Sequence, residues 1–118
     1  MIQPPDESQA LAALSALSES TRLRILRFLV ARGPQGAPAG EIGEAIGFSS
    51  SRGSFHLGVL ARAGLVTATK SSRQVIYRAD TVAIGALMGY LINDCCGADP
   101  QIVACCSPAA ACRPQGES

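Results

Sequence analysis

Short apolar stretches with helical spacing, each closed by a glycine, precede the only strand-rich part of this chain. Gly33, Gly47 and Gly64 follow three such stretches, and glycine often follows the last turn of a helix. Leu65–Thr69 and Gln74–Arg78 then supply Val, Ile, Thr and Tyr on either side of a polar tip, which predicts a β-hairpin. This order predicts a mainly α fold with a β-hairpin wing, a winged helix-turn-helix.

The apolar spacing also sets the expected helices before the hairpin. A first helix is expected over Ser8–Leu17, and a second starts at hydroxyl caps within Ser18–Thr21 and stops at Gly33–Pro34. After a loop at residues 35–37, the third helix has Pro38 in its first turn. The fourth has Ser49 as its N-cap and faces the core with Gly53, Leu57, Leu60 and Ala61.

A last helix is expected after the hairpin, capped by Asp80 or Thr81 and running through Ile92. Its apolar coverage is wide for a surface helix, so we expect a homodimer helix that packs with the first helix. From Ala98 the composition turns to Ala, Pro, Gly and Ser, which predicts an irregular and partly mobile tail. The expected units are a DNA-binding and dimerisation domain, 8–97, and a tail, 98–118.

The third and fourth helices, joined by a turn containing Gly47, form the pattern of a helix-turn-helix. The outer face of the fourth helix is polar or small apart from Phe55, and a helix of this kind fits the major groove of DNA. Arg52 can pair with guanine and Phe55 can touch a thymine methyl, whereas a structural role is favoured for His56 over a phosphate contact. The predicted DNA-binding residues are Ser50, Ser51, Arg52, Ser54, Phe55, His56 and, at the hairpin tip, Lys70 and Arg73.

The charge distribution supports this surface. The net charge is only +1, but residues 45–79 contain no Asp or Glu and five Lys or Arg residues. Such a segment is an ordinary solvated face about as often as a nucleic-acid surface. Beside a helix-turn-helix, it favours operator DNA as the partner over a plain protein-interaction module.

Three segments of the chain resemble the ArsR/SmtB repressor family: Leu17–Leu26, Ser49–Leu57 and Ala63–Val66. The resemblance covers roughly Leu11 to Leu91 and implies a dimeric winged helix that binds an inverted-repeat operator and is derepressed by a metal or metalloid. Two positions depart from the family pattern: Phe55 stands where a basic residue is usual, and Ser71–Ser72 where the wing tip usually has glycine. These departures bear on the operator sequence more than on DNA binding itself.

All five cysteines lie in the last quarter of the chain, four of them as the vicinal pairs Cys95–Cys96 and Cys105–Cys106. Some relatives bind arsenic through cysteines in the third helix, but residues 40–46 of this chain contain no sulfur. Zinc-sensing relatives use His and carboxylate ligands on the last helix, and residues 81–93 of this chain contain neither. The chain resembles relatives that sense arsenite through a late vicinal pair and a tail cysteine. The expected ligands are Cys95, Cys96, Cys105 and Cys106, for arsenite, methylarsenite or antimonite, and Cys112 is expected to be dispensable.

Other roles for the thiols stay open. A redox sensor is less favoured because the chain has no C-x-x-C motif. A tetrahedral zinc or cadmium site is less favoured because adjacent cysteines close such a site poorly. The thiols can also be interface filler or have no role. No leader or membrane span is evident, so we expect a cytoplasmic regulator rather than an enzyme.

Overall fold

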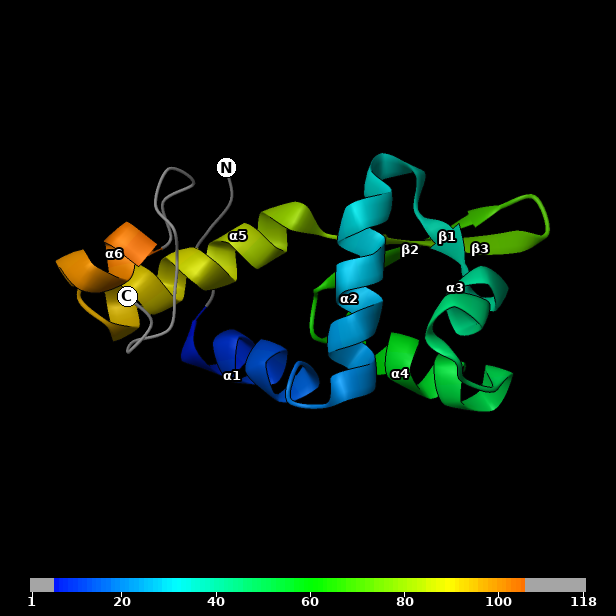
Figure 1. The fold of residues 1–118 in the computed structure, drawn as a ribbon, viewed down its shortest axis with the longest axis horizontal. Coiled ribbons are helices and arrows are strands. Elements are labelled where there is room, and N and C mark those ends of the chain that lie inside the picture. The colour runs from blue at the N-terminus through cyan, green and yellow to red at the C-terminus, as the bar shows by residue number, and fades with distance from the viewer. Residues whose placement is uncertain (1–5, 106–118) are drawn as a thin grey trace, which may run out of the picture.

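The computed structural model describes residues 6–105, apart from the side chains of Cys95 and Cys105. Figure 1 shows α1 and α5 at one end of the molecule, α3 and the wing at the other, and α2 between them. The predicted mainly α fold with a hairpin wing is confirmed. Its elements are α1 (Glu7–Ala16), α2 (Ser20–Arg32), the 3-10 turn η1 (Gly33–Gln35), β1 (Ala37–Pro38), α3 (Ala39–Ile46), α4 (Ser50–Arg62), β2 (Val66–Ser71), β3 (Gln74–Ala79), α5 (Thr81–Gly89), the π-helical segment η2 (Tyr90–Cys95) and α6 (Pro100–Cys105).

The wing is an antiparallel sheet with the strand order β1-β3-β2. The hairpin pairs Val66 with Ala79 at its base and Ser71 with Gln74 at its end, so the turn consists of Ser72 and Arg73. Strand β1 adds Ala37 opposite Tyr77. The strand was not predicted: Ala37 was expected in a loop and Pro38 in the third helix, because a two-residue strand shows no alternation and its pairing comes from a distant segment.

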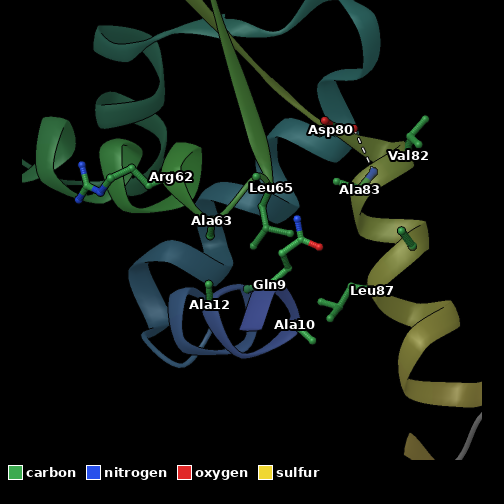
Figure 2. A pocket seen from close by; sticks show the side chains of 13 residues that line it. Gln9, Ala10, Ala12, Arg62, Ala63, Leu65, Asp80, Val82, Ala83 and Leu87 are labelled. Atoms are coloured by element: carbon green, nitrogen blue, oxygen red, sulfur yellow. Dashed lines mark hydrogen bonds between the residues drawn. The ribbon is translucent and has the colours of Figure 1, made fainter. Parts of the chain in front are cut away.

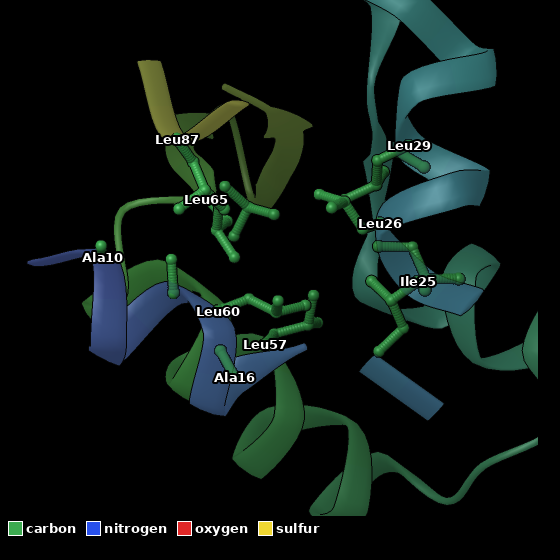
Figure 3. Packing of buried hydrophobic residues seen from close by; sticks show 13 residues of the cluster. Ala10, Ala16, Ile25, Leu26, Leu29, Leu57, Leu60, Leu65 and Leu87 are labelled. Atoms are coloured by element: carbon green, nitrogen blue, oxygen red, sulfur yellow. The ribbon is translucent and has the colours of Figure 1, made fainter. Parts of the chain in front are cut away.

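The core joins side chains from all five helices α1 to α5 and from the wing (Figure 3). Its largest fully buried members are Ile25, Leu29, Ile42, Leu57, Leu60 and Leu65. The predicted inner face of α4 is correct for Gly53, Leu57 and Leu60 but wrong for Ala61, which is exposed. Ala61 is one residue round the helix from Leu60, on a flank that stays open to solvent.

Three helix starts test the expected caps. Ser49 caps α4 and Asp80 caps α5, as predicted. The start of α2 was predicted wrongly: the cap is the Glu19 carboxylate rather than a hydroxyl. Pro38 also lies one residue outside α3, because it belongs to β1.

The described residues after α5 are more regular than expected. The last helix continues from α5 through η2 and ends at Cys95, and the chain then turns at Gly97 and Ala98, whose φ angles are 61° and 55°. The Asp99 carboxylate accepts a hydrogen bond from the Gln101 N–H at 2.9 Å, which favours a helix starting at Pro100. The irregular tail predicted from Ala98 is therefore wrong over Pro100–Cys105, and its remainder lies outside the described residues.

Helices α1 and α5 both line a cavity of about 430 Å³, with Gln9 and Ala10 on one side and Leu87 on the other (Figure 2). Several apolar side chains of these helices face solvent instead of the core: Leu11, Leu14, Val82 and Met88. Within residues 6–105, no helix is both long and apolar enough to span a bilayer.

Candidate nucleic-acid interface

Helix α4 presents the residues predicted to read DNA. Ser50, Ser51, Arg52 and Ser54 are exposed, and Phe55 is 60% exposed. They share this outer face because Gly53, Leu57 and Leu60 bury the opposite one. The first turns of the helix therefore offer hydroxyls, a guanidinium and one aromatic ring to a partner.

The turn between α3 and α4 depends on close packing around Phe48. Gly47 has a φ of 93°, which favours glycine at this position. A Cβ on Gly53 would lie 2.8 Å from Phe48 Cδ1, and one on Gly43 would lie 3.2 Å from the Phe48 carbonyl oxygen. Glycine on both helices thus allows a close approach to Phe48, which a larger residue at either position would crowd.

His56 differs from its neighbours on α4, because its side chain is only 12% exposed. Arg22 Nη1 lies 3.1 Å from His56 Nδ1, and Glu19 Oε1 lies 4.0 Å from the same nitrogen. Phe55 packs edge-on against the imidazole, with 5.4 Å between the ring centroids. The structural role favoured for His56 agrees with these contacts, but its partners Glu19 and Arg22 were not predicted from the sequence.

Glu19 is the acidic residue where the start of α2 meets His56 of α4. Its Oε1 accepts hydrogen bonds from the Thr21 N–H at 2.8 Å and the Arg22 N–H at 3.2 Å. Desolvation raises the pKa of the carboxyl, but those two backbone hydrogen bonds, together with the charge of Arg22 and that of His56 when its ring is protonated, outweigh it and lower the pKa. Glu19 therefore stays ionised at the start of α2, where a negative charge is favourable.

The wing places its cations near the far end of the hairpin. Arg73 is in the two-residue turn, and Lys70 lies within β2 opposite Val75 rather than at the tip itself. Both are exposed. Ser72, before Arg73, has a φ of 56°, a backbone conformation for which glycine is favoured.

The segment that carries Cys95 and Cys96 lies at the other end of the molecule from the wing (Figure 1). Cys95 and Cys96 come at the end of η2, and Cys96 is exposed. Cys105 ends α6, while Cys106 and Cys112 lie outside the described residues. Among the described side chains, no group of three or more His, Cys, Asp or Glu could hold a metal ion. The predicted four-cysteine set lies mostly outside these side chains, because only Cys96 of the four is among them.

The wing cations are expected to bind phosphates. Replacing Lys70 and Arg73 together with alanine is expected to reduce the slope of log affinity against log salt by about 0.9 for each phosphate that the variant no longer neutralises. Fluorescence anisotropy with duplex DNA over a salt series measures this slope. An unchanged slope, equal to that of an Arg24→Ala control on α2, would place the wing away from DNA.

Glu19 is expected to make stability depend on acid pH. Because its pKa is lowered in the folded state, its stabilising charge is present at neutral pH and is lost as the pH falls through that lowered pKa. Glu19→Gln keeps an oxygen that can accept both backbone hydrogen bonds but removes the charge. We expect a lower melting temperature at neutral pH, with the gap to the original protein closing toward about pH 3.

Thermal denaturation between about pH 3 and 7 tests this expectation. Glu44→Gln, which removes an exposed carboxylate from α3, is the matched control. If both variants followed the same curve, the charge of Glu19 would contribute nothing specific.

The fold and the exposed face of α4 define a winged helix-turn-helix DNA-binding protein. Consistent with this class, the sequence matches a family described as a helix-turn-helix domain over residues 17–68. No protein of curated function matches the sequence. The ArsR-like transcriptional regulator of Rhodococcus sp. RHA1 is 25% identical, with a TM-score of 0.68, and the match covers 88% of this chain and 95% of that one.

Two further solved structures of transcriptional regulators are similar to this chain. The homodimeric winged helix-turn-helix domain Mb0332 of Mycobacterium bovis is 27% identical, with a TM-score of 0.59 over 80% of this chain and 91% of that one. A structure described as a "possible transcriptional regulator for arsenical resistance" is 28% identical, with a TM-score of 0.62 over 81% and 97%. These comparisons confirm the resemblance: the chain has a winged helix-turn-helix fold and is similar to solved transcriptional regulators of the ArsR family.

Proposed function

We propose that this protein is a metalloid-responsive repressor, which binds operator DNA as a homodimer and dissociates when trivalent arsenic binds its C-terminal thiolates. The observation that carries the proposal is the position of Cys95–Cys96. The pair ends the last long helical segment, whereas residues 1–94 contain no cysteine. Thiols sorted in this way suit a sensing site separate from the DNA-reading face.

The donor set fits arsenic chemistry. Trivalent arsenic and antimony are soft and thiophilic, so they favour thiolate ligands. Cys95 and Cys96 supply two thiolates, which suffice for a methylated arsenical, and arsenite takes a third from Cys105 or Cys106. The reversal at Gly97 and Ala98 turns the chain into α6, which ends at Cys105, and closing so short a loop costs little entropy.

A homodimer is supported by the outer faces of α1 and α5. Leu11 is 58% exposed and Val82 52% exposed, an arrangement that favours burial against a second copy. One structural neighbour, the domain from Mycobacterium bovis, is described as homodimeric. With α1 and α5 at the interface, the two α4 helices would face half-sites about 34 Å apart.

Release of DNA follows from where the thiols lie. Cys95 and Cys96 end the helical segment that begins as α5, so metalloid binding acts on an element of the proposed interface. A small rotation of one subunit against the other changes the separation of the α4 helices and misaligns one of them with its groove. Coupling of about 1 to 3 kcal/mol is typical for such linkage.

The test uses reduced full-length protein and a duplex selected from a random-sequence pool. Fluorescence anisotropy should show binding that weakens as salt rises and that is reversed by adding arsenite. Sedimentation of the free protein should give a dimer. Binding that arsenite, methylarsenite and antimonite all leave unchanged would overturn the proposed inducer, and absence of DNA binding would overturn the repressor itself.

A second candidate is a thiol-based redox sensor, which the exposure of Cys96 beside another cysteine favours. Oxidation would then take the place of metalloid binding. Release of DNA by peroxide, reversed by a reductant and not reproduced by arsenite, would select this function.

A further inference from the structure

Arg22 joins three elements at the edge of the DNA-reading face. Its Nε donates a hydrogen bond at 2.7 Å to the carbonyl oxygen of Ala16, the last residue of α1. Its Nη1 lies 3.1 Å from Nδ1 of His56, which is on α4. One guanidinium on α2 therefore connects the end of α1 with the recognition helix.

The chemistry of the two side chains fixes the direction of the second hydrogen bond. Arginine only donates, so Nδ1 of His56 accepts, and the proton of the neutral ring is on Nε2. His56 lines a cavity of about 410 Å³ beside the start of α2, together with Ser51, Arg52 and Phe55 of the DNA-reading face. The orientation of this imidazole is thus set by a residue outside α4.

We propose that Arg22 is a positioning residue for DNA binding: it holds His56 in the Nε2–H form and keeps α4 in a fixed position relative to α1. The inference rests on the proposed function, in which α4 reads operator DNA and α1 belongs to the dimer interface. The Arg22 link lies on the path between the interface and the reading helix. Its removal changes operator affinity through the orientation of α4.

The arrangement is specific to a guanidinium. Two different nitrogens of the planar group serve partners on two helices at once, whereas the single ammonium of a lysine does not reproduce this fork. Glu19, 4.0 Å from Nδ1, is the competing partner. Its carboxylate can attract Nδ1 only when that nitrogen carries a hydrogen, whereas the Arg22 guanidinium can donate to Nδ1 only when it does not.

The test compares Arg22→Met and Arg22→Lys with Arg24→Met, which removes an equal charge from the exposed face of the same helix. We expect both Arg22 variants to bind the selected duplex about tenfold more weakly, because neither can make both of the hydrogen bonds that the guanidinium donates to α1 and α4. Arg24→Met should show only the small decrease that its charge explains. Circular dichroism and melting curves verify that each variant is folded.

A spectroscopic readout separates positioning from general stability. His56 is the only histidine of the chain, so ¹⁵N shifts of its ring report the tautomer without overlap. At alkaline pH we expect the Nε2–H form in the original protein and a mixture of tautomers in both Arg22 variants. His56→Gln, whose amide both accepts and donates, should keep more affinity than His56→Phe.

The outcomes distinguish this inference from the proposed function. If the original protein binds DNA while both Arg22 variants keep its affinity and its tautomer, the inference is wrong and the repressor proposal stands. If the original protein does not bind DNA, the proposed function has failed, whereas the tautomer shift still reports whether Arg22 orients His56. Should Arg22→Lys restore full affinity, charge rather than the fork would be responsible.

Discussion

Replacing Cys95 and Cys96 together with serine is expected to leave operator binding intact and to abolish its reversal by arsenite. The hydroxyls are close in size to the thiols, so the end of η2 should keep its structure, but they do not provide the soft thiolates that trivalent arsenic needs. Coupling between two sites typically changes affinity by about 5-fold to 150-fold. In the double variant we expect this factor to fall to one, measured by anisotropy with and without arsenite.

The second vicinal pair allows the ligand number to be measured. With Cys105→Ser and Cys106→Ser combined, we expect a weakened response to arsenite, which takes three thiolates, and a retained response to methylarsenite, which takes two. Cys112→Ser is the matched control and should respond like the original protein. Full release of DNA from the Cys95→Ser, Cys96→Ser variant would move the sensing site into the tail.

Local signals account for the parts of the fold that the sequence predicted well. Ser49 before an apolar stripe and Gly64 after it place α4 almost to the residue, because capping and periodicity act within one segment. The hairpin is equally local, since its strands are neighbours in sequence. The exposed face of α4, including Phe55, follows directly from this periodicity.

Contacts between distant segments account for what the sequence did not predict. β1 exists only because Ala37 meets Tyr77 across 40 positions of the chain, and its two residues carry no strand pattern of their own. The partner of His56 is 34 positions away on α2, where Arg22 is one of several arginines in the sequence. A weak signal for Glu19 was present, because an acidic residue just before an apolar helical stripe favours the helix N-terminus.

The proposed DNA-reading site and the proposed sensing site lie at opposite ends of the molecule. The reading helix and the wing carry no cysteine, and the cysteines lie beyond the elements that form the winged helix. Any signal from the thiols must therefore travel through α5 and the dimer interface, or through α1 to Arg22 and α4. The Arg22 variants and the cysteine variants test separate steps of this path, so a combined variant measures their coupling.

Gly36→Ala is expected to destabilise the protein more than Gly33→Ala, although both glycines have backbone conformations that are nearly restricted to glycine. Their φ and ψ angles are 64° and −161° for Gly36 and 71° and −150° for Gly33. Forcing alanine into such a region costs about 1 to 3 kcal/mol at either site. A Cβ on Gly36 would also press on the Tyr77 carbonyl oxygen and lie 2.7 Å from Arg78 Cγ, whereas one on Gly33 meets nothing within 4 Å.

The excess expected for Gly36→Ala over Gly33→Ala is about 1 to 3 kcal/mol, the usual cost of overpacking. Chemical denaturation of both variants measures it as the difference between their free energies of unfolding. Because Gly36 directly precedes β1, its crowding also pushes this strand away from β3 and with it the base of the wing. We therefore expect Gly36→Ala, but not Gly33→Ala, to weaken DNA binding under conditions in which both variants are folded. Equal decreases in stability would mean that the strain of the two glycines, rather than the close approach of β1 to β3, sets the cost.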